Sequence, residues 1–128
     1  MLDLPLVAQE LDFTCGAACF ESMFRYLRGI SLGERYFARK MGTLELGYTP
    51  PERVVSLALA YGFECSMRTD ASLSDLRAAL AMGWVIFITW WDEDAGHYSL
   101  LRSMSESEVV LMDPWTAREG CDNHLTIA

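Results

Sequence analysis

Four residues of this chain are of the types that thiol-based acyl transfer requires. Gln9 precedes a Cys15-Gly16 pair by a short segment, and His97 and Asp113 follow in the last third of the sequence. In this chemistry a thiolate attacks a carbonyl, an imidazole takes and returns the proton, and a carboxylate orients the imidazole. An amide N–H stabilises the oxyanion. The candidate catalytic residues are therefore Cys15, His97, Asp113 and Gln9.

The sequence after Cys15 predicts an amphipathic helix that begins at this cysteine. Apolar residues recur at helical spacing up to Leu27, and Arg28-Gly29 is typical of a helix end. The unpaired N–H groups and the positive dipole end of a helix start favour a thiolate. Gly16 would let substrate or neighbouring backbone approach the sulfur. Taken alone, however, a cysteine at this position is more often a packing residue.

A predicted hairpin brings the histidine and the aspartate together. Residues 97–102 and 109–112 have strand patterns, and residues 103–108 form a turn between them. Pairing of the two strands would set His97, at the start of one, opposite Asp113, at the end of the next. Viewed alone, each is more often an edge histidine or a turn initiator. Together with Cys15 across a cleft they favour a catalytic site, because one fold accounts for the spacing of all four residues.

The remaining pattern predicts a helical half followed by an antiparallel sheet, which is an α+β architecture. We expect one domain over residues 1–128, with the helical half ending at about residue 82 and the sheet half starting at 84. Apolar residues 84–90 predict a strand that is buried on both faces. Further helix starts are expected at residues 31–34, 49–52 and 72–75, a loop at 43–48, and strands at 63–69 and 124–127.

The composition excludes several classes of protein. The chain is 52% hydrophobic and 12% aromatic, which indicates a folded core, and its net charge of −8 with no basic patch argues against a nucleic-acid binder. The apolar run 84–91 is too short to cross a bilayer, and there is no signal-peptide pattern. We therefore expect a cytoplasmic protein with no membrane segment, whose cysteines are free thiols: Cys15, Cys19, Cys65 and Cys121.

Residues 9–27 (QELDFTCGAACFESMFRYL) resemble the opening of the bacteriocin-processing, double-glycine cysteine peptidase domains and their stand-alone papain-like relatives. Residues 96–101 (GHYSLL) are similar to the histidine strand of that family, and residues 110–115 (VLMDPW) to its aspartate strand. The resemblance covers nearly the whole chain. It implies a bacterial cysteine peptidase with Cys15 as nucleophile, His97 as general base and acid, Asp113 as orienter, and Gln9 with the Cys15 N–H as oxyanion donors.

The resemblance also implies a papain-like fold with the active-site cleft between helices and sheet, a peptide or protein substrate, and no cofactor or metal. Thr14 stands where an aspartate commonly precedes the cysteine. No transmembrane or nucleotide-binding region follows, so we do not expect a complete processing exporter. Association with a transporter or an additional domain stays open. Candidate substrate-binding residues are Trp91, Tyr98 and Trp115, with Trp90 beside them.

Three other functions stay open at this point. The same residues would serve acyl or glutamyl transfer, with an amine in place of water. A non-catalytic relative that binds peptides is a second alternative, although such a protein gains nothing from keeping all four residues. A metal site is a third, because Cys15 and Cys19 lie on one helical face, but the sequence offers no second close pair of ligands.

Overall fold

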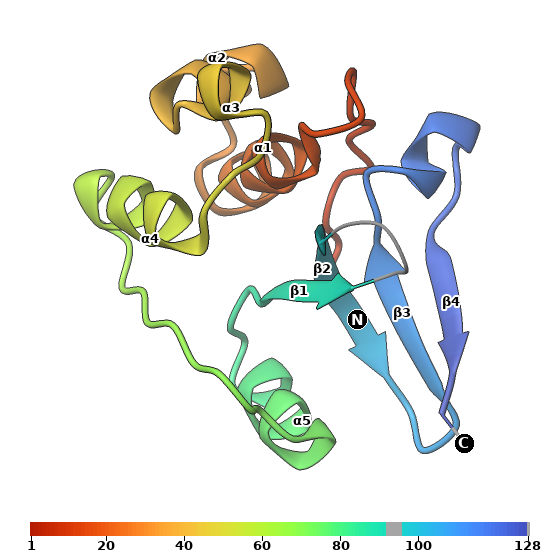
Figure 1. Ribbon diagram of the computed structural model, residues 1–128. Helices are drawn as coiled ribbons and strands as arrows, with labels where there is room; N and C mark the ends of the chain where they lie inside the picture. Colours follow the sequence, from red (N-terminus) through yellow and green to blue (C-terminus); the bar gives the residue numbers. More distant parts are fainter. Residues whose placement is uncertain (92–95, 128) are drawn as a thin grey trace.

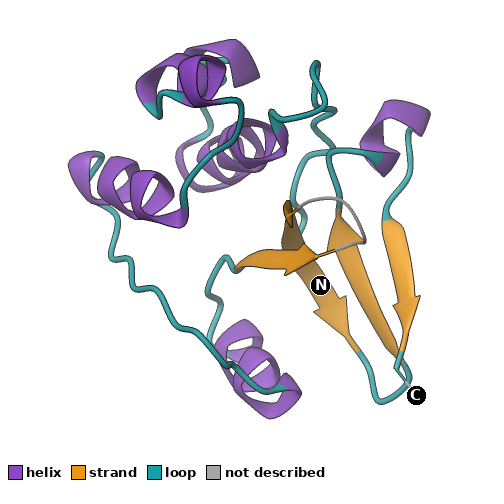
Figure 2. Ribbon diagram, in the orientation of Figure 1, coloured by secondary structure: helices purple, strands orange, loops and turns teal. Residues whose placement is uncertain are grey.

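The computed structural model describes residues 1–91 and 96–127. Within this part of the chain the helices come first and the strands follow, as Figures 1 and 2 show. The α+β prediction is therefore confirmed. The helices are α1 (Cys15–Arg28), α2 (Glu34–Lys40), α3 (Thr43–Leu46), α4 (Pro51–Ala60) and α5 (Leu73–Ala81), with a 3-10 turn η1 (Thr116–Glu119). The strands are β1 (Phe87–Trp91), β2 (Gly96–Met104), β3 (Glu108–Met112) and β4 (Asn123–Thr126).

The described strands form one antiparallel sheet in the order β1-β2-β3-β4, so each strand pairs with its neighbour in sequence. Trp90 of β1 lies opposite His97 of β2, and Leu100 of β2 lies opposite Met112 of β3. The register shifts between Leu101 and Ser103, where β2 bulges. These pairings bring the predicted histidine and aspartate segments to the same end of the sheet.

Helix α1 is the central helix and lies between α2 and the sheet (Figure 1). Phe20 and Phe24 on α1 pack against Phe37 of α2, with ring centroids 4.7 and 5.3 Å apart. Leu100 and Met112 bring β2 and β3 into the same buried cluster. Burial of this much aromatic and aliphatic surface fixes α1 on the sheet, and with it the position of Cys15.

The segment ahead of α1 joins the helical part of the chain to the sheet. The Leu2 N–H donates to the Arg102 carbonyl (3.1 Å), and the Gln9 N–H donates to the Pro114 carbonyl (3.1 Å). The segment thus runs from β2 to the turn that follows Asp113. Gln9 is thereby held beside the end of β3, although it is far from this strand in the sequence.

Two predictions about helices were wrong. Residues 31–34 are not a capping box: α2 begins after Gly33, and the Ser31 hydroxyl donates to the carboxylate of Glu21 (3.0 Å). Glu21 is fully buried, although it is a charged residue. Residues 43–48, predicted to be a loop, contain the short helix α3. The capping box at residues 72–75 is confirmed by the reciprocal bonds of Ser72 and Asp75 (3.1 and 2.9 Å).

Two predictions about strands were also wrong. Residues 63–69 form no strand, and the strand expected at 84–90 is shorter and starts at Phe87. This strand, β1, is half-buried rather than buried on both faces, because it is the edge of the sheet and a cavity lies beside it. Apolar composition alone does not separate an edge strand beside a cavity from a central strand.

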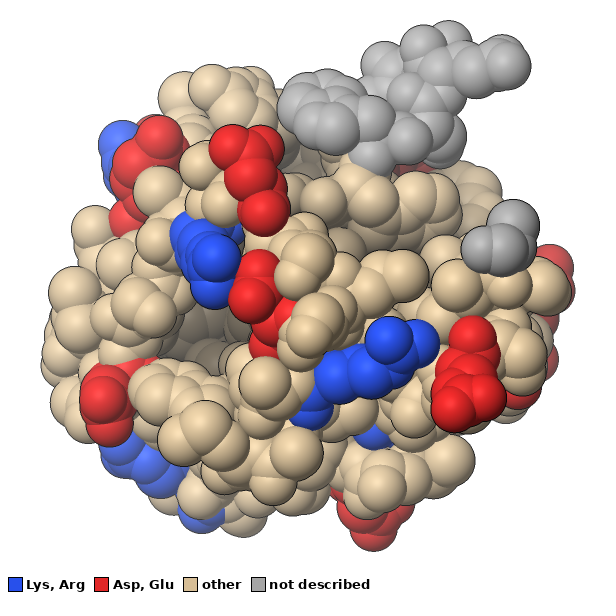
Figure 3. All heavy atoms as spheres, turned by 90° about the horizontal axis from the view of Figure 1, so that it is seen from below, with Lys and Arg blue, Asp and Glu red and all other residues tan. Residues whose placement is uncertain are grey.

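That cavity has a volume of about 700 Å³ and lies among α1, α4, α5 and β1. Its walls are mainly apolar, and Arg68 and Asp75, which form an ion pair (3.2 Å), line it as well. Figure 3 views the molecule from the α5 side and shows a hollow with uncharged walls and charged residues at its mouth. No helix in the described part of the chain is both long enough and apolar enough to span a membrane.

Candidate active site

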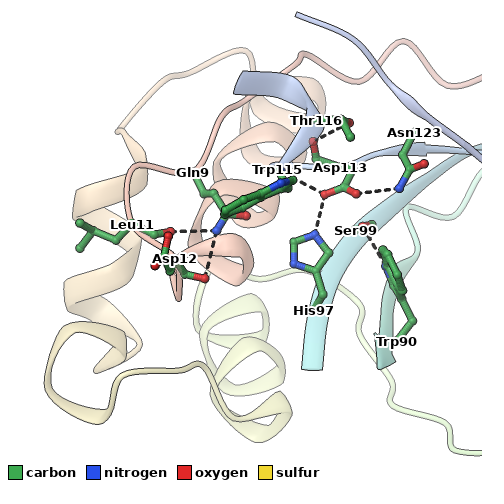
Figure 4. Close-up of polar contacts among 10 residues, drawn as sticks. All are labelled: Gln9, Leu11, Asp12, Trp90, His97, Ser99, Asp113, Trp115, Thr116 and Asn123. Atoms are coloured by element: carbon green, nitrogen blue, oxygen red, sulfur yellow. Dashed lines mark hydrogen bonds and ion pairs between the residues drawn. The ribbon is translucent and has the colours of Figure 1, made fainter. Parts of the chain in front are cut away.

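His97 and Asp113 form the closest polar contact of the site. The Nε2 atom of His97 lies 2.5 Å from Oδ1 of Asp113 (Figure 4). The prediction that the two residues lie directly opposite each other was wrong. The pairing of β2 with β3 ends at Leu100 and Met112, and one further step in this register would set Asp113, the residue after β3, opposite Ser99. Because side chains alternate between sheet faces, His97 shares the face of Ser99 and meets Asp113 diagonally. The expected pairing of base and carboxylate is therefore present with a shift of two residues.

Both oxygens of the Asp113 carboxylate accept hydrogen bonds. Oδ1 also accepts the backbone N–H of Trp115 (3.0 Å), and Oδ2 accepts the side-chain amide of Asn123 (2.9 Å). Asp113 is only 2% exposed. Burial by itself raises the pKa of this carboxyl, but the hydrogen bonds from His97, Asn123 and Trp115 outweigh it and lower the pKa below its ordinary value. Asp113 is thus an ionised, fixed acceptor at neutral pH.

The surroundings of His97 favour its protonated form. Burial alone lowers its pKa, but hydrogen bonds to Asp113 and Cys15, and the negative charges there, raise the pKa to about 9. The Trp90 indole stands edge-on to the imidazole, with centroids 5.4 Å apart, and donates from Nε1 to the Ser99 hydroxyl (3.1 Å). The ring is therefore fixed both by an acceptor and by an aromatic neighbour.

Cys15 is the first residue of α1 and lies beside His97. Cys15 is 7% exposed, and its side chain is among the groups that raise the pKa of His97. Since Nε2 of His97 is occupied by Asp113, the nitrogen available to the thiol is Nδ1, which Figure 4 shows on the opposite side of the ring. The side chain of Thr14, the residue before the helix, accepts no hydrogen bond from the first turn of α1. The first N–H groups of α1 are therefore not occupied by a capping side chain.

Gly16 allows the first turn of α1 to approach its neighbours closely. A Cβ atom at this position would lie 3.1 Å from the Thr49 side chain and 3.2 Å from the Tyr98 ring. Both neighbours are fixed: Thr49 Oγ1 bonds to Thr43 Oγ1 (2.7 Å), and the Tyr98 hydroxyl donates to the Thr49 carbonyl (2.7 Å). The glycine was predicted to admit substrate or backbone; the structure assigns the space to these two side chains.

Gln9 is 3% exposed and uses its amide within its own loop. Its Nε2 donates to the carbonyls of Leu11 (2.8 Å) and Asp12 (3.2 Å), as Figure 4 shows. Its Oε1 is buried without a hydrogen-bond partner among the described residues. Donation to an oxyanion, as predicted for Gln9, would therefore replace the longer of these two bonds.

The candidate substrate-binding residues lie in three different environments. The side chain of Trp91 lies outside the described residues. Tyr98 is buried against Gly16 and lines the cavity. Trp115 is 49% exposed at the end of the Asp113 segment, where the Arg118 guanidinium stacks on its ring at 4.4 Å. Of the two residues described, only Trp115 offers a large surface to solvent.

Sequence reasoning missed Asn123 and Thr49 as supports of the site. Asn123 was expected only next to a short final strand, and Thr49 only as a residue before a helix start. The register of β4, which sets Asn123 opposite Leu111, is what carries its amide to Asp113. A polar residue in a strand next to the aspartate strand was the one available signal.

The cysteines do not form disulfides or a metal cluster in the described part of the chain. All four are free, and no group of three or more potential ligands could hold a metal ion there. Cys19 lies one helical turn after Cys15 and is fully buried; burial raises its pKa well above the usual value, and the charges of Cys15 and Asp113 add to this. Cys19 is thus a packing residue.

Comparison with known proteins agrees with this arrangement. The model of the peptidase C39 family matches residues 3–123, which is nearly the whole chain. The chain belongs to the peptidase C39 family. The resemblance to bacteriocin-processing cysteine peptidases is thereby confirmed, and membership of C39 supports cysteine peptidase activity in general.

A relative of this C39 chain occurs in Methanothermobacter thermautotrophicus (strain Delta H) and is described as an uncharacterized protein. The two are 30% identical over 116 residues, which covers 91% of this chain and 75% of the relative. The helices and the antiparallel sheet described above are compatible with the C39 assignment.

Proposed function

We propose that this chain is a papain-like cysteine peptidase or amidase that cleaves a peptide bond through a thioester on Cys15. The observation that carries the proposal is the contact of His97 Nε2 with Asp113 at 2.5 Å, which leaves Nδ1 as the ring nitrogen not bound to the carboxylate. A histidine oriented in this way by a buried carboxylate, beside a thiol at a helix start, is the arrangement that nucleophilic thiol catalysis requires.

In the first half of the reaction, Nδ1 of His97 holds the proton that leaves the Cys15 thiol. The thiolate attacks the substrate carbonyl carbon, and the carbonyl electron pair moves to oxygen. The Cys15 N–H and one Gln9 amide N–H stabilise that oxyanion. The C–N bond then breaks as the imidazolium gives its proton to the amine, which leaves. The products are a free amine and a Cys15 thioester.

In the second half, water replaces the amine. Nδ1 of His97 takes a proton from the water as its oxygen attacks the thioester carbon, and the C–S bond breaks to release a carboxylic acid. The sulfur regains the proton through the imidazolium. Asp113 holds the ring orientation in both halves and stabilises its charge. An amine in place of water would give acyl transfer by the same steps.

The substrate, in this proposal, is a peptide with apolar residues near the cleaved bond. Tyr98 lines the cavity of about 700 Å³ and also packs against Gly16, the neighbour of Cys15. The apolar walls thus begin next to the candidate nucleophile. Large apolar pockets with a few polar groups are the common form of a binding site.

The test is the alkylation rate of each cysteine against pH, mapped by mass spectrometry. Iodoacetamide is applied to the native chain and to His97→Ala, with the half-buried Cys65 and the exposed Cys121 as internal controls. We expect Cys15 to react fast well below pH ~8.5, the usual range of a free thiol. We also expect this advantage to disappear in His97→Ala, while the two controls keep their rates.

If Cys15 reacts no faster than Cys121 at any pH, the peptidase proposal fails. A peptide-binding role on the same fold then becomes the better interpretation. Peptide cleavage by the native chain, lost in Cys15→Ala, would complete the positive result.

A further inference from the structure

We propose that Asn123 is a positioning residue of this site: its amide holds the second oxygen of Asp113 so that the first oxygen faces His97. The proposal deepens the proposed function and rests on it. Asn123 does not touch the reacting atoms; it would act through Asp113 alone.

The contacts around the Asp113 carboxylate divide between its two oxygens. Oδ1 faces His97 and the Trp115 N–H, and Oδ2 accepts from Asn123 Nδ2 at 2.9 Å. Among the described residues, Asn123 is the only partner of Oδ2. Figure 4 shows Asn123 approaching one carboxylate oxygen of Asp113 while His97 approaches the other. Both oxygens of the carboxylate are thus held by hydrogen bonds.

The fold delivers Asn123 to this place through the sheet. Asn123 pairs with Leu111, and Asp113 is two residues beyond Leu111, so both share one face. His97 lies on the same face of β2 by the alternation already described. One row of side chains therefore crosses three adjacent strands, from histidine to aspartate to asparagine.

The role of the hydrogen bond from Asn123 follows from the rotational freedom of an aspartate side chain. Rotation about its Cβ–Cγ bond is broad and roughly two-fold, so a carboxylate held at one oxygen can turn. Turning would lengthen the bond to His97 and leave a buried oxygen without a donor. A neutral amide fixes the plane without adding a charge to compete with the imidazolium. Supporting bonds of this kind keep reacting groups in geometry.

Two possible roles of the Asn123 amide predict opposite effects of its removal on the acidity of His97, so an experiment can separate them. If Asn123 only withdraws charge from Asp113, its loss would strengthen the hold on His97 and make the imidazole a weaker acid. If Asn123 positions Asp113, its loss would loosen that hold and make the imidazole a stronger acid. The proposal predicts the second outcome.

The test is an NMR titration of the histidines, of which the chain has two, His97 and His124. It compares the native chain, Asn123→Leu and Asn123→Ala. Asn123→Leu keeps the volume without a donor, and Asn123→Ala leaves space and avoids a clash if the first variant fails to fold. His124→Gln is the control, because it changes the next residue of β4 and an exposed side chain. It also assigns the signals.

We expect the acid dissociation constant of His97 to rise by about tenfold or more in both Asn123 variants and to be unchanged in His124→Gln. The alkylation rate of Cys15 at neutral pH should fall severalfold, with Cys121 unaffected. An unchanged or lower dissociation constant in a folded Asn123 variant overturns the proposal. The titration needs no activity, so it tests Asn123 even if Cys15 proves unreactive and the peptidase proposal fails.

Discussion

The Nε2 atom of His97 is committed to Asp113 at 2.5 Å, and this contact decides the chemistry open to the ring. An imidazole has two nitrogens, and the bond made by one fixes the role of the other. With Nε2 held, Nδ1 is the nitrogen that would exchange a proton with Cys15 in the proposed mechanism. The carboxylate reaches the ring because Asp113 directly follows β3, next to the end of β2 that carries His97.

The first prediction concerns the pH dependence of stability. The pKa of His97 is about 9 in the folded chain against an ordinary 6.5. Its contribution is therefore complete below pH 6.5 and is lost as pH rises through about 9. We expect the free energy of unfolding of the native chain to fall relative to that of His97→Gln across this window, by at most about 3 kcal/mol.

Urea denaturation at a series of pH values measures this difference. His124→Gln serves as the matched control, since it removes the other histidine from an exposed site. Parallel curves for the native chain and His97→Gln between pH 6.5 and 9 would show that His97 is not held as described.

How far the sequence predicts the site depends on the kind of information that each residue carries. The start of α1 at Cys15 and its end before Gly29 follow from local periodicity and a glycine in the left-handed region, and both are confirmed. The hairpin of β2 and β3 is also local. These elements alone bring His97 and Asp113 close enough to be found.

What the sequence does not predict is set by contacts between distant segments. Glu21 is a charged residue of an amphipathic helix, and only the position of residues 31–33 explains its burial. Likewise, the partners of Gln9 Nε2 are carbonyls of its own loop, whose shape is fixed by the bond to Pro114. A periodic sequence pattern carries no information about either interaction.

The second prediction is that Gly16→Ala will impair the site. The new Cβ would stand 3.1 Å from Thr49 and 3.2 Å from Tyr98, which are both held by hydrogen bonds, so the first turn of α1 must move. We expect a loss of about 1–3 kcal/mol in the free energy of unfolding, typical of overpacking. The alkylation rate of Cys15 should fall in parallel. Native values of both would show that the turn adapts freely.

The third prediction separates the role of Gln9 from that of His97. Gln9→Ala removes the proposed oxyanion donor, and loss of one such donor costs roughly 100–1,000-fold in kcat. Alkylation by iodoacetamide forms no oxyanion, so the Cys15 alkylation rate should remain near native. The measurement compares kcat for peptide cleavage with the alkylation rate of Cys15, both on one preparation of the variant. A loss of both rates would assign Gln9 to the folding of the 9–14 loop instead.

The fourth prediction tests the apolar cavity as the substrate site. Val55 of α4 lines this cavity and is half-buried, so Val55→Glu places a charge in it. We expect KM for an apolar peptide to rise at least about tenfold with kcat little changed, because burying an unpaired carboxylate opposes binding. Val55→Ala is the matched control. Equal KM values in the three proteins would exclude the cavity from substrate binding.

The last prediction concerns Glu21, the buried carboxylate that shapes the turn between α1 and α2. Its oxygens accept from the N–H groups of Leu32 (2.9 Å) and Gly33 (2.8 Å), from the Ser31 hydroxyl (3.0 Å) and from Arg25 Nε (2.7 Å). Burial by itself raises its pKa, but these donors, led by Gly33 and Arg25, lower it overall. Glu21→Gln turns an N–H₂ group toward several donors, and we expect a loss of about 2–4 kcal/mol in stability.

The pH dependence of this loss gives the sharper test. A carboxyl with a lowered pKa stabilises the folded chain above its ordinary value of 4.5, and the contribution disappears as pH falls through the folded value. The gap between native chain and Glu21→Gln should therefore be full at pH 7 and narrow below pH 4.5. Glu45→Gln, at an exposed position on α3, should cost little at any pH. If the difference in stability between the native chain and Glu21→Gln stays constant well below pH 4.5, the shape of the Glu21 side chain, and not its charge, stabilises the fold.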